Sequence, residues 1–186
     1  MKKEIRVLGI DDAPFNKFKK GNALIIATVF RGGSWLEGIL STKASIDGSN
    51  ATKKLADMIN KSKFKPQLQC VFLDGIAVAG FNVIDVGELS KKTRLPVIVV
   101  MRKMPNIKKI KEALIKLNKK NKIGLIEKAG KIIKMENIYV QLIGIEIDKA
   151  KELLKIVCTR SFIPEPLRIA HLIASGIIYG ESRGKA

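Results

Sequence analysis

The stretch QCVFLDGIAVAGFNVIDVGELSKKTRLPVIVVM, Gln69–Met101, decides the fold class because it holds two apolar runs separated by a segment of helix length. The first run, Gln69–Leu73, is almost continuously apolar, as is typical of a central strand buried on both faces. The second run, Pro96–Met101, has the same character, and Val83–Thr93 between them predicts a helix. A strand, a helix and a strand at this spacing predict a parallel crossover unit.

The residues before this unit predict strands joined in antiparallel order. Two apolar runs come first, at Ile5–Ile10 and Ala23–Phe30. Gly32-Gly33 then predicts a turn into a third strand, Trp35–Ile46, by the logic of a hairpin. Ala51–Asn60 follows with the spacing of apolar residues that predicts a helix.

The residues after the unit continue the alternation of helices and strands. Ile107–Leu117 predicts an amphipathic helix with lysines on its outer face. Ile123–Met135 predicts a short hairpin or a pair of loops, and Ile138–Ile143 a strand. Ile147–Cys158 predicts a helix, and Leu167–Ala174 a final helix after a Pro-Glu-Pro entry.

Taken together, these elements predict a single α/β domain over residues 1–186. Three antiparallel strands followed by parallel strands make a mixed sheet of five to six strands, with helices on both faces. This order is the pattern of the ribonuclease H-like architecture. Open sheets of this kind bind ligands at the carboxyl ends of their strands.

The charge of the chain indicates its partners. There are 35 Lys and Arg residues against 17 Asp and Glu residues, a formal net charge of +18. Such an excess favours nucleic acid first and an anionic membrane surface second; a solvated, lysine-rich surface of a heat-tolerant protein is a third interpretation. No apolar run is long enough to span a bilayer, and the isolated Cys70 and Cys158 suggest buried free thiols, so we expect a cytoplasmic protein.

Two acids stand where strands of the predicted sheet end. Asp11 follows the first strand and Asp74 the fourth, and these strands are expected to be parallel neighbours. Two carboxylates at the ends of adjacent strands repel each other unless a cation or a proton lies between them. Carboxylate oxygens are ligands that suit Mg²⁺ or Mn²⁺. Asp at a strand end is also a common turn former, so both interpretations are open.

Two further residues are candidates for the same site. Asp12 is expected to tune such a site or to cap a turn. His171, the one histidine of the sequence, is either a packing residue or a ligand.

Four segments of the chain match motifs of a known family: LGID (Leu8–Asp11), LDGIAVAGFNVIDVGELSKKTRLPVIVVMRK (Leu73–Lys103), IYVQLIGIEIDKAKELL (Ile138–Leu154) and FIPEPLRIAH (Phe162–His171). They resemble the endonuclease V family, in the same order and at comparable spacing over most of the chain. The C-terminal segment is similar to that family's Pro-Glu-Pro-Thr-Arg signature, which ends in Ala-His or Ala-Asp. The nearest resemblance is to an uncharacterised archaeal family related to endonuclease V, which shares DGIAVAGFNVID and the tail GESRG.

The resemblance implies a ribonuclease H-like fold, cleavage of nucleic acid strands with Mg²⁺ or Mn²⁺, and roles for particular residues. By position, Asp11 and Asp74 match the metal-binding aspartates, and His171 matches a fourth active-site member that binds metal or moves protons. A family Glu before the first helix is absent here, and the nearest acids are Asp47 first and Glu37 second. Arg102 or Lys103 matches the basic residue that contacts phosphate.

One departure from the family limits what carries over. Endonuclease V has a Pro-Tyr-Ile-Pro wedge that separates strands at a deaminated base, and this sequence has no such motif. We therefore expect a metal-dependent nucleic-acid phosphodiesterase that does not recognise hypoxanthine by a wedge. Two alternatives are a non-catalytic nucleic-acid-binding protein that keeps the fold, and an enzyme acting on a small phosphorylated substrate, for which no glycine-rich phosphate loop is present.

Overall fold

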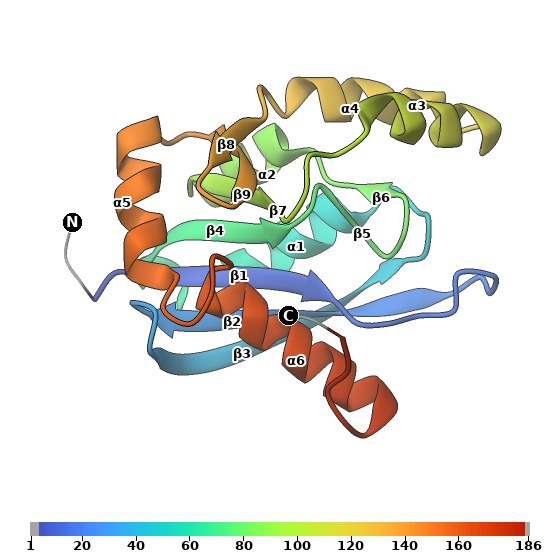
Figure 1. Cartoon of the computed structure of the whole chain (residues 1–186). Coiled ribbons are helices and arrows are strands. Elements are labelled where there is room, and N and C mark those ends of the chain that lie inside the picture. The colour runs from blue at the N-terminus through green and yellow to red at the C-terminus, as the bar shows by residue number, and fades with distance from the viewer. Residues whose placement is uncertain (1–3, 185–186) are drawn as a thin grey trace.

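A central sheet of seven strands organises the computed structural model, which describes residues 4–184 (Figure 1). Its strand order is β3-β2-β1-β4-β7-β9-β8, and a separate hairpin, β5-β6, stands beside it. The strands are β1 (Arg6–Asp12), β2 (Asn22–Arg31), β3 (Trp35–Ser45), β4 (Leu68–Asp74), β5 (Ala77–Val78), β6 (Asn82–Val83), β7 (Val97–Met101), β8 (Ile133–Met135) and β9 (Ile138–Ile143). The helices are α1 (Ala51–Asn60), α2 (Val86–Thr93), α3 (Ile107–Lys116), α4 (Ile123–Lys128), α5 (Ile147–Val157) and α6 (Glu165–Tyr179), with 3-10 turns at Lys65–Gln67 and Lys120–Lys122.

The strand directions confirm the predicted mixed sheet. β1 is antiparallel to β2, and β2 to β3, whereas β1, β4 and β7 run parallel to one another. The sheet is larger than the five to six strands predicted, because β9 and β8 extend it beyond β7 in antiparallel order. The parallel strands β1 and β4 therefore lie at the centre, where their carboxyl ends share one edge.

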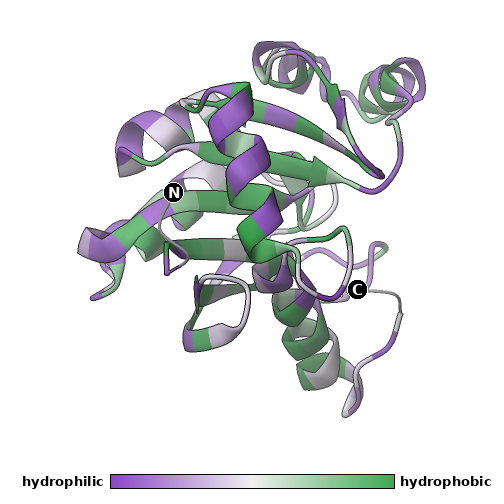
Figure 2. Cartoon of the chain, turned by 60° about the vertical axis from the view of Figure 1, so that its left-hand side comes forward, coloured by the Kyte–Doolittle hydropathy of each residue, from purple (hydrophilic) through white to green (hydrophobic). Residues whose placement is uncertain are grey.

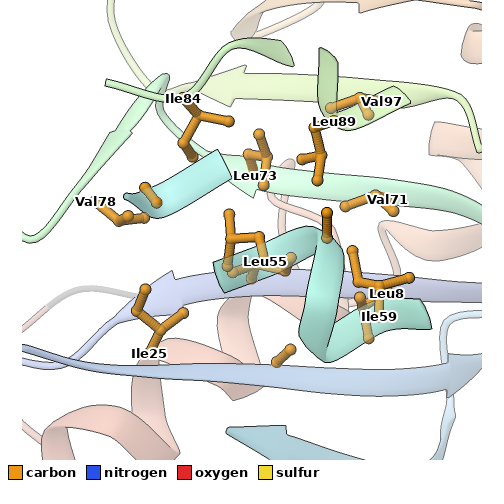
Figure 3. Close-up of a cluster of buried hydrophobic side chains, with 14 of the residues drawn as sticks. Leu8, Ile25, Leu55, Ile59, Val71, Leu73, Val78, Ile84, Leu89 and Val97 are labelled. Carbon is orange, nitrogen blue, oxygen red and sulfur yellow. The ribbon is translucent and has the colours of Figure 1, made fainter. Parts of the chain in front are cut away.

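One face of the sheet packs against α1 and α2. Leu8 of β1 and Leu73 of β4 lie in a buried cluster with Leu55 and Ile59 of α1 and Leu89 of α2 (Figure 3). All five side chains are at most 1% exposed. Burial of this many branched side chains supplies the main stabilisation of the domain.

The opposite face packs against α5 and α6. Val7 of β1 and Phe72 of β4 point away from the first cluster, because side chains alternate along a strand. They lie in a second buried cluster with Leu153 of α5 and Leu167 of α6. Figure 2 shows strands that are largely apolar, while the helices carry both apolar and polar residues. The sheet is thus covered on both sides, which explains why its central strands read as continuous apolar runs.

Several boundaries differ from the sequence-based expectation. The region expected as a hairpin or loop pair, Ile123–Met135, holds the helix α4 and the strand β8. The helix expected from Val83 begins at Val86, after the β5-β6 hairpin and an Asp85 side chain that caps it. The last helix is longer than expected, because its apolar residues continue to Tyr179 and an αL glycine, Gly180, ends it.

Two further expectations concern burial and membranes. Cys70 is fully buried, as expected, whereas Cys158 is only half-buried; both are free thiols. Burial raises the pKa of the Cys158 thiol to about 12. Between residues 4 and 184, no helix has the length and apolar character needed to cross a bilayer.

Candidate active site

The two acids at the strand ends lie on neighbouring strands in matching register. Ile10 of β1 pairs with Leu73 of β4, so the next residues along the two parallel strands, Asp11 and Asp74, are also neighbours. Gly9 faces α6 and Phe72 belongs to the cluster under α5 and α6. Alternation along each strand therefore turns both carboxylates toward the α5–α6 face of the sheet.

The α6 helix reaches this edge because small residues allow it to approach the sheet closely. A Cβ atom at Gly9 would lie only 2.4 Å from the backbone carbon of Pro166, so a larger residue does not fit there. The hydroxyl of Thr28 on β2 donates a hydrogen bond of 2.6 Å to the carbonyl of Pro166. These contacts fix the first turn of α6 on β1 and β2, and His171 follows one turn after the buried Leu167.

His171 contacts the first acid directly. Its Nδ1 atom lies 2.9 Å from a carboxylate oxygen of Asp11, which is only 6% exposed. This hydrogen bond, and then the charge of Asp11, raise the pKa of His171, which favours the charged ring. Nε2 is buried and has no hydrogen-bond partner within residues 4–184; the nearby backbone of Arg183 favours the charged ring without accepting a well-formed hydrogen bond.

Arg102 contacts the second acid. It follows β7, and its guanidinium lies 3.3 Å from a carboxylate oxygen of Asp74. The pKa of Asp74 is nevertheless raised, first by burial and then by the charge of Asp11, while Arg102 and His171 partly oppose the shift. The site therefore holds two neighbouring carboxylates, one in contact with His171 and the other with Arg102.

Asp12 joins the same cluster from the end of β1. Its carboxylate accepts a hydrogen bond of 2.8 Å from the backbone N–H of Ala79, at the tip of the β5-β6 hairpin. Burial, followed by the charge of Asp11, raises the pKa of Asp12 to about 6, and the charge of Asp74 acts in the same direction. Three carboxylates thus repel one another at one edge of the sheet.

The raised pKa of Asp12 predicts that Asp12→Asn stabilises the metal-free protein at neutral pH. The folded protein holds the proton more tightly than the unfolded chain, so wild-type stability falls as the pH rises from about 4 to about 6 and stays lower above that. The amide oxygen of Asn still accepts the Ala79 N–H but carries no charge. We expect the variant to gain on the order of 1–2 kcal/mol at pH 7 and nothing at pH 3.

Urea unfolding in EDTA, repeated from pH 3 to pH 8, measures this difference. A variant that is no more stable than wild type at pH 7 would show that the Asp12 carboxylate is not strained by its surroundings.

A divalent cation fits the chemistry of these residues. Carboxylate oxygens are the ligands that Mg²⁺ prefers, usually one or two of them together with waters and substrate phosphates. The mutual repulsion of Asp11, Asp12 and Asp74 favours such an ion. In the described part of the chain, however, no three metal-ligating side chains already converge on one point.

The other residues considered from the sequence lie outside this cluster. The Asp47 carboxylate accepts the backbone N–H of Phe81 at 2.8 Å and lies 3.6 Å from the Lys119 ammonium. Glu37 pairs with Arg6 at 2.7 Å, at the start of β1 and thus at the opposite end of that strand from Asp11. Lys103 is exposed beside Arg102.

Comparison with known proteins places this geometry in a family. The family model described as endonuclease dU matches residues 3–178. The chain belongs to the endonuclease dU family. A UPF0215 protein of Methanothermobacter thermautotrophicus is 50% identical over 191 residues, which cover 100% of this chain and 94% of the relative.

Solved structures share the fold of this chain. The crystal structure of a protein of unknown function from Archaeoglobus fulgidus has a TM-score of 0.88 and 38% identity to this endonuclease dU family member, covering 94% of this chain and 99% of that one. Endonuclease V of Ciona intestinalis, solved with a DNA that contains inosine, has a TM-score of 0.55 and 19% identity, covering 89% of this chain and 82% of that one. The second likeness confirms the ribonuclease H-like fold of endonuclease V.

Sequence reasoning missed the contact between the acid cluster and the β5-β6 hairpin. The tip of β5-β6 is built from Ala79 and Gly80, both with positive φ, and a Cβ at Gly80 would lie 2.5 Å from the Asp47 carboxylate. The Ala-Gly pair in DGIAVAGFN is a turn signal, but the strands on either side have only two residues each. Such short strands carry no readable periodicity, so their position beside Asp12 was not predictable.

Proposed function

We propose that this protein is a divalent-metal-dependent endonuclease that cleaves phosphodiester bonds in nucleic acid. The observation that carries the proposal is the placing of Asp11 and Asp74 side by side at the carboxyl ends of neighbouring parallel strands, with His171 and Arg102 in contact with them. A bound Mg²⁺ or Mn²⁺ would supply Lewis-acid stabilisation of the phosphoryl oxygens and a water of lowered pKa.

The residues of the chain have separate tasks in this proposal. Asp11 and Asp74 would hold the ion, and we propose Asp12, the next residue on β1, as the third carboxylate in place of Asp47. Asp47 instead contacts Lys119 and the Phe81 backbone. His171 would hold or release a proton at Nε2, the ring nitrogen that does not contact Asp11.

Arg102 and Lys103 are the groups proposed to hold the substrate phosphate. Arg102 is already at the edge of the cluster, and its planar guanidinium suits two oxygens of one phosphate. If Asp74 turns toward a bound ion, Arg102 loses its present partner and becomes available for that phosphate. Lys103 would add a second positive charge to the same contact.

The substrate that we propose to test first is a DNA strand with a single deoxyuridine. The family description, endonuclease dU, points to this base, and the sequence lacks the wedge motif associated with hypoxanthine. The net charge of +18 suits a polyanionic strand. A cavity of about 730 Å³ opens between α5 and the β8-β9 hairpin, but none of the cluster residues lines it, so we favour an extended strand over a small phosphorylated molecule.

A second candidate is a nucleic-acid-binding protein without catalysis. It is favoured by the contacts of Arg102 with Asp74 and of His171 with Asp11, because these cations compensate the two carboxylates without a metal ion. This candidate predicts salt-dependent binding and intact strands in the presence of any divalent ion.

The test is a cleavage assay on matched labelled strands that contain deoxyuridine, deoxyinosine or only ordinary bases. Each strand is incubated single-stranded and as a duplex with Mg²⁺, Mn²⁺ or EDTA. We expect metal-dependent cleavage that is fastest on the deoxyuridine strand. Binding of all strands with no cleavage under any of these conditions would favour the second candidate.

A further inference from the structure

The positive charge of the chain is concentrated in one segment. Residues 102–131, here called the lysine-rich arm, contain eleven of the 35 basic residues and two of the 17 acidic residues. The arm therefore carries half of the net charge of +18 in 30 of 186 residues. It begins at Arg102, the residue that contacts Asp74, and so is continuous with the candidate active site.

The arm forms a surface unit outside the main sheet. It comprises α3, the 3-10 turn and α4, which lie together at the upper right of Figure 1, above the β5-β6 hairpin. Eight of its eleven basic residues are exposed. On α3, Lys108, Lys109 and Lys116 share the outer face with Glu112, while Leu114 points inward and is fully buried.

The arm is held firmly on the hairpin that contacts the acid cluster. Leu114 and Ile126 form a small core with Val83, and Phe81 packs against it. Val83 and Phe81 belong to the same β5-β6 hairpin as Ala79, whose N–H donates to Asp12. The exposed lysines are thus attached to the same short element that lines the acid cluster.

A buried lysine adds to this attachment. Lys122 is 4% exposed, and its ammonium donates to the carbonyl oxygens of Asp47, Gly48 and Phe81. Burial lowers the pKa of Lys122, so holding its charge there costs free energy that these carbonyls offset. Contacts of this kind fix the position of the arm relative to the hairpin.

We infer that the lysine-rich arm is the surface that binds the phosphate backbone of the strand next to the cluster of Asp11, Asp74 and His171. The inference rests on the proposed function for the identity of the ligand. Charge complementarity favours a polyanion, and the continuity of the arm with Arg102 favours one that also reaches the acid cluster. An anionic membrane is the less favoured partner, because Leu114 of α3 is buried and Ile107 and Ile110 pack against the same small core, which leaves only Ile115 exposed among the large apolar residues of α3.

The test compares two charge-reversal variants with wild type. The arm variant carries Lys108→Glu, Lys109→Glu and Lys116→Glu. The control carries Lys54→Glu, Lys61→Glu and Lys91→Glu, three exposed lysines on and beside α1 and α2, with the same change in net charge. Binding of a labelled deoxyuridine strand is measured by fluorescence anisotropy in EDTA over a range of salt concentrations, and circular dichroism checks folding.

We expect the arm variant to bind at least about tenfold more weakly at moderate salt and to lose about two units of the slope of log K against log salt. The control should keep the wild-type slope and most of the affinity. Equal effects in both variants, or none in either, would overturn the inference. A loss of binding to anionic lipid vesicles with unchanged strand binding would also overturn it, in favour of a membrane surface.

This experiment is independent of cleavage. If wild type binds through the arm but cleaves no strand with Mg²⁺ or Mn²⁺, the proposed endonuclease function fails and the arm assignment holds. If wild type cleaves and the arm variant binds as wild type does, the arm assignment alone fails.

Discussion

Asp74→Asn is expected to lower the rate of metal-dependent strand cleavage by on the order of a thousandfold or more. An amide lacks the negative charge that would hold a divalent ion between the ends of β1 and β4. The variant should fold at least as well as wild type, because the Asp74 carboxyl is destabilised by burial and by Asp11. The loss of activity would therefore be separate from any loss of structure.

Single-turnover cleavage of the deoxyuridine strand, with enzyme in excess, measures the effect on the chemical step. Asp148→Asn on α5 is the matched control, since its side chain is 86% exposed and pairs only with the neighbouring Lys151 across 3.4 Å in the described chain. Cleavage by Asp74→Asn within a few fold of wild type would remove Asp74 from the metal site and with it the proposed mechanism.

Gly9→Ala is expected to destabilise the protein by about 2–3 kcal/mol, the effect of adding a methyl group where there is no space. The new Cβ would lie 2.4 Å from the Pro166 carbon and 2.6 Å from the Leu167 nitrogen, and both are backbone atoms that cannot rotate away. The first turn of α6 must then move away from β1. Since His171 is on the same helix, its contact with Asp11 should weaken as well.

Thermal and urea unfolding measure the change in stability, and the pKa of His171 from NMR reports the contact with Asp11. We expect this pKa to move back toward its ordinary value in Gly9→Ala. Gly124→Ala on α4 is the control, because its Cβ would have no atom within 4 Å and alanine favours a helix. If Gly9→Ala is as stable as wild type, close packing of α6 on β1 does not position the site.

Most of the fold was predictable because its central elements carry strong local signals. Gln69–Leu73 and Pro96–Met101 are apolar on both faces, so they read as buried parallel strands, and they are β4 and β7. The predicted bounds of one helix and one strand are the same as the observed bounds, those of α1 (Ala51–Asn60) and β9 (Ile138–Ile143). By contrast, α4 has only six residues, too few for the 3.6-residue period to be distinguished from a loop.

The candidate site was predictable in part. Strand ends and sheet order predicted that Asp11 and Asp74 are neighbours, and the resemblance to endonuclease V added His171 and Arg102. In the structure His171 contacts Asp11 and Arg102 contacts Asp74, while the roles of these residues stay predictions. The contact of Asp12 with Ala79 and the buried position of Lys122 depend on the hairpin and the arm meeting in space. Pairings between segments so distant in sequence leave no periodic signal in either segment.

The most direct test of a metal-dependent site is calorimetric titration of Mn²⁺ into the protein, alone and with an uncleavable phosphorothioate deoxyuridine strand. The comparison protein carries Asp11→Asn together with Asp74→Asn. We expect saturable Mn²⁺ binding to wild type that is lost in the double variant, while the strand still binds both proteins. Equal Mn²⁺ binding by both proteins, or no Mn²⁺ binding by wild type even with the strand present, would contradict this expectation.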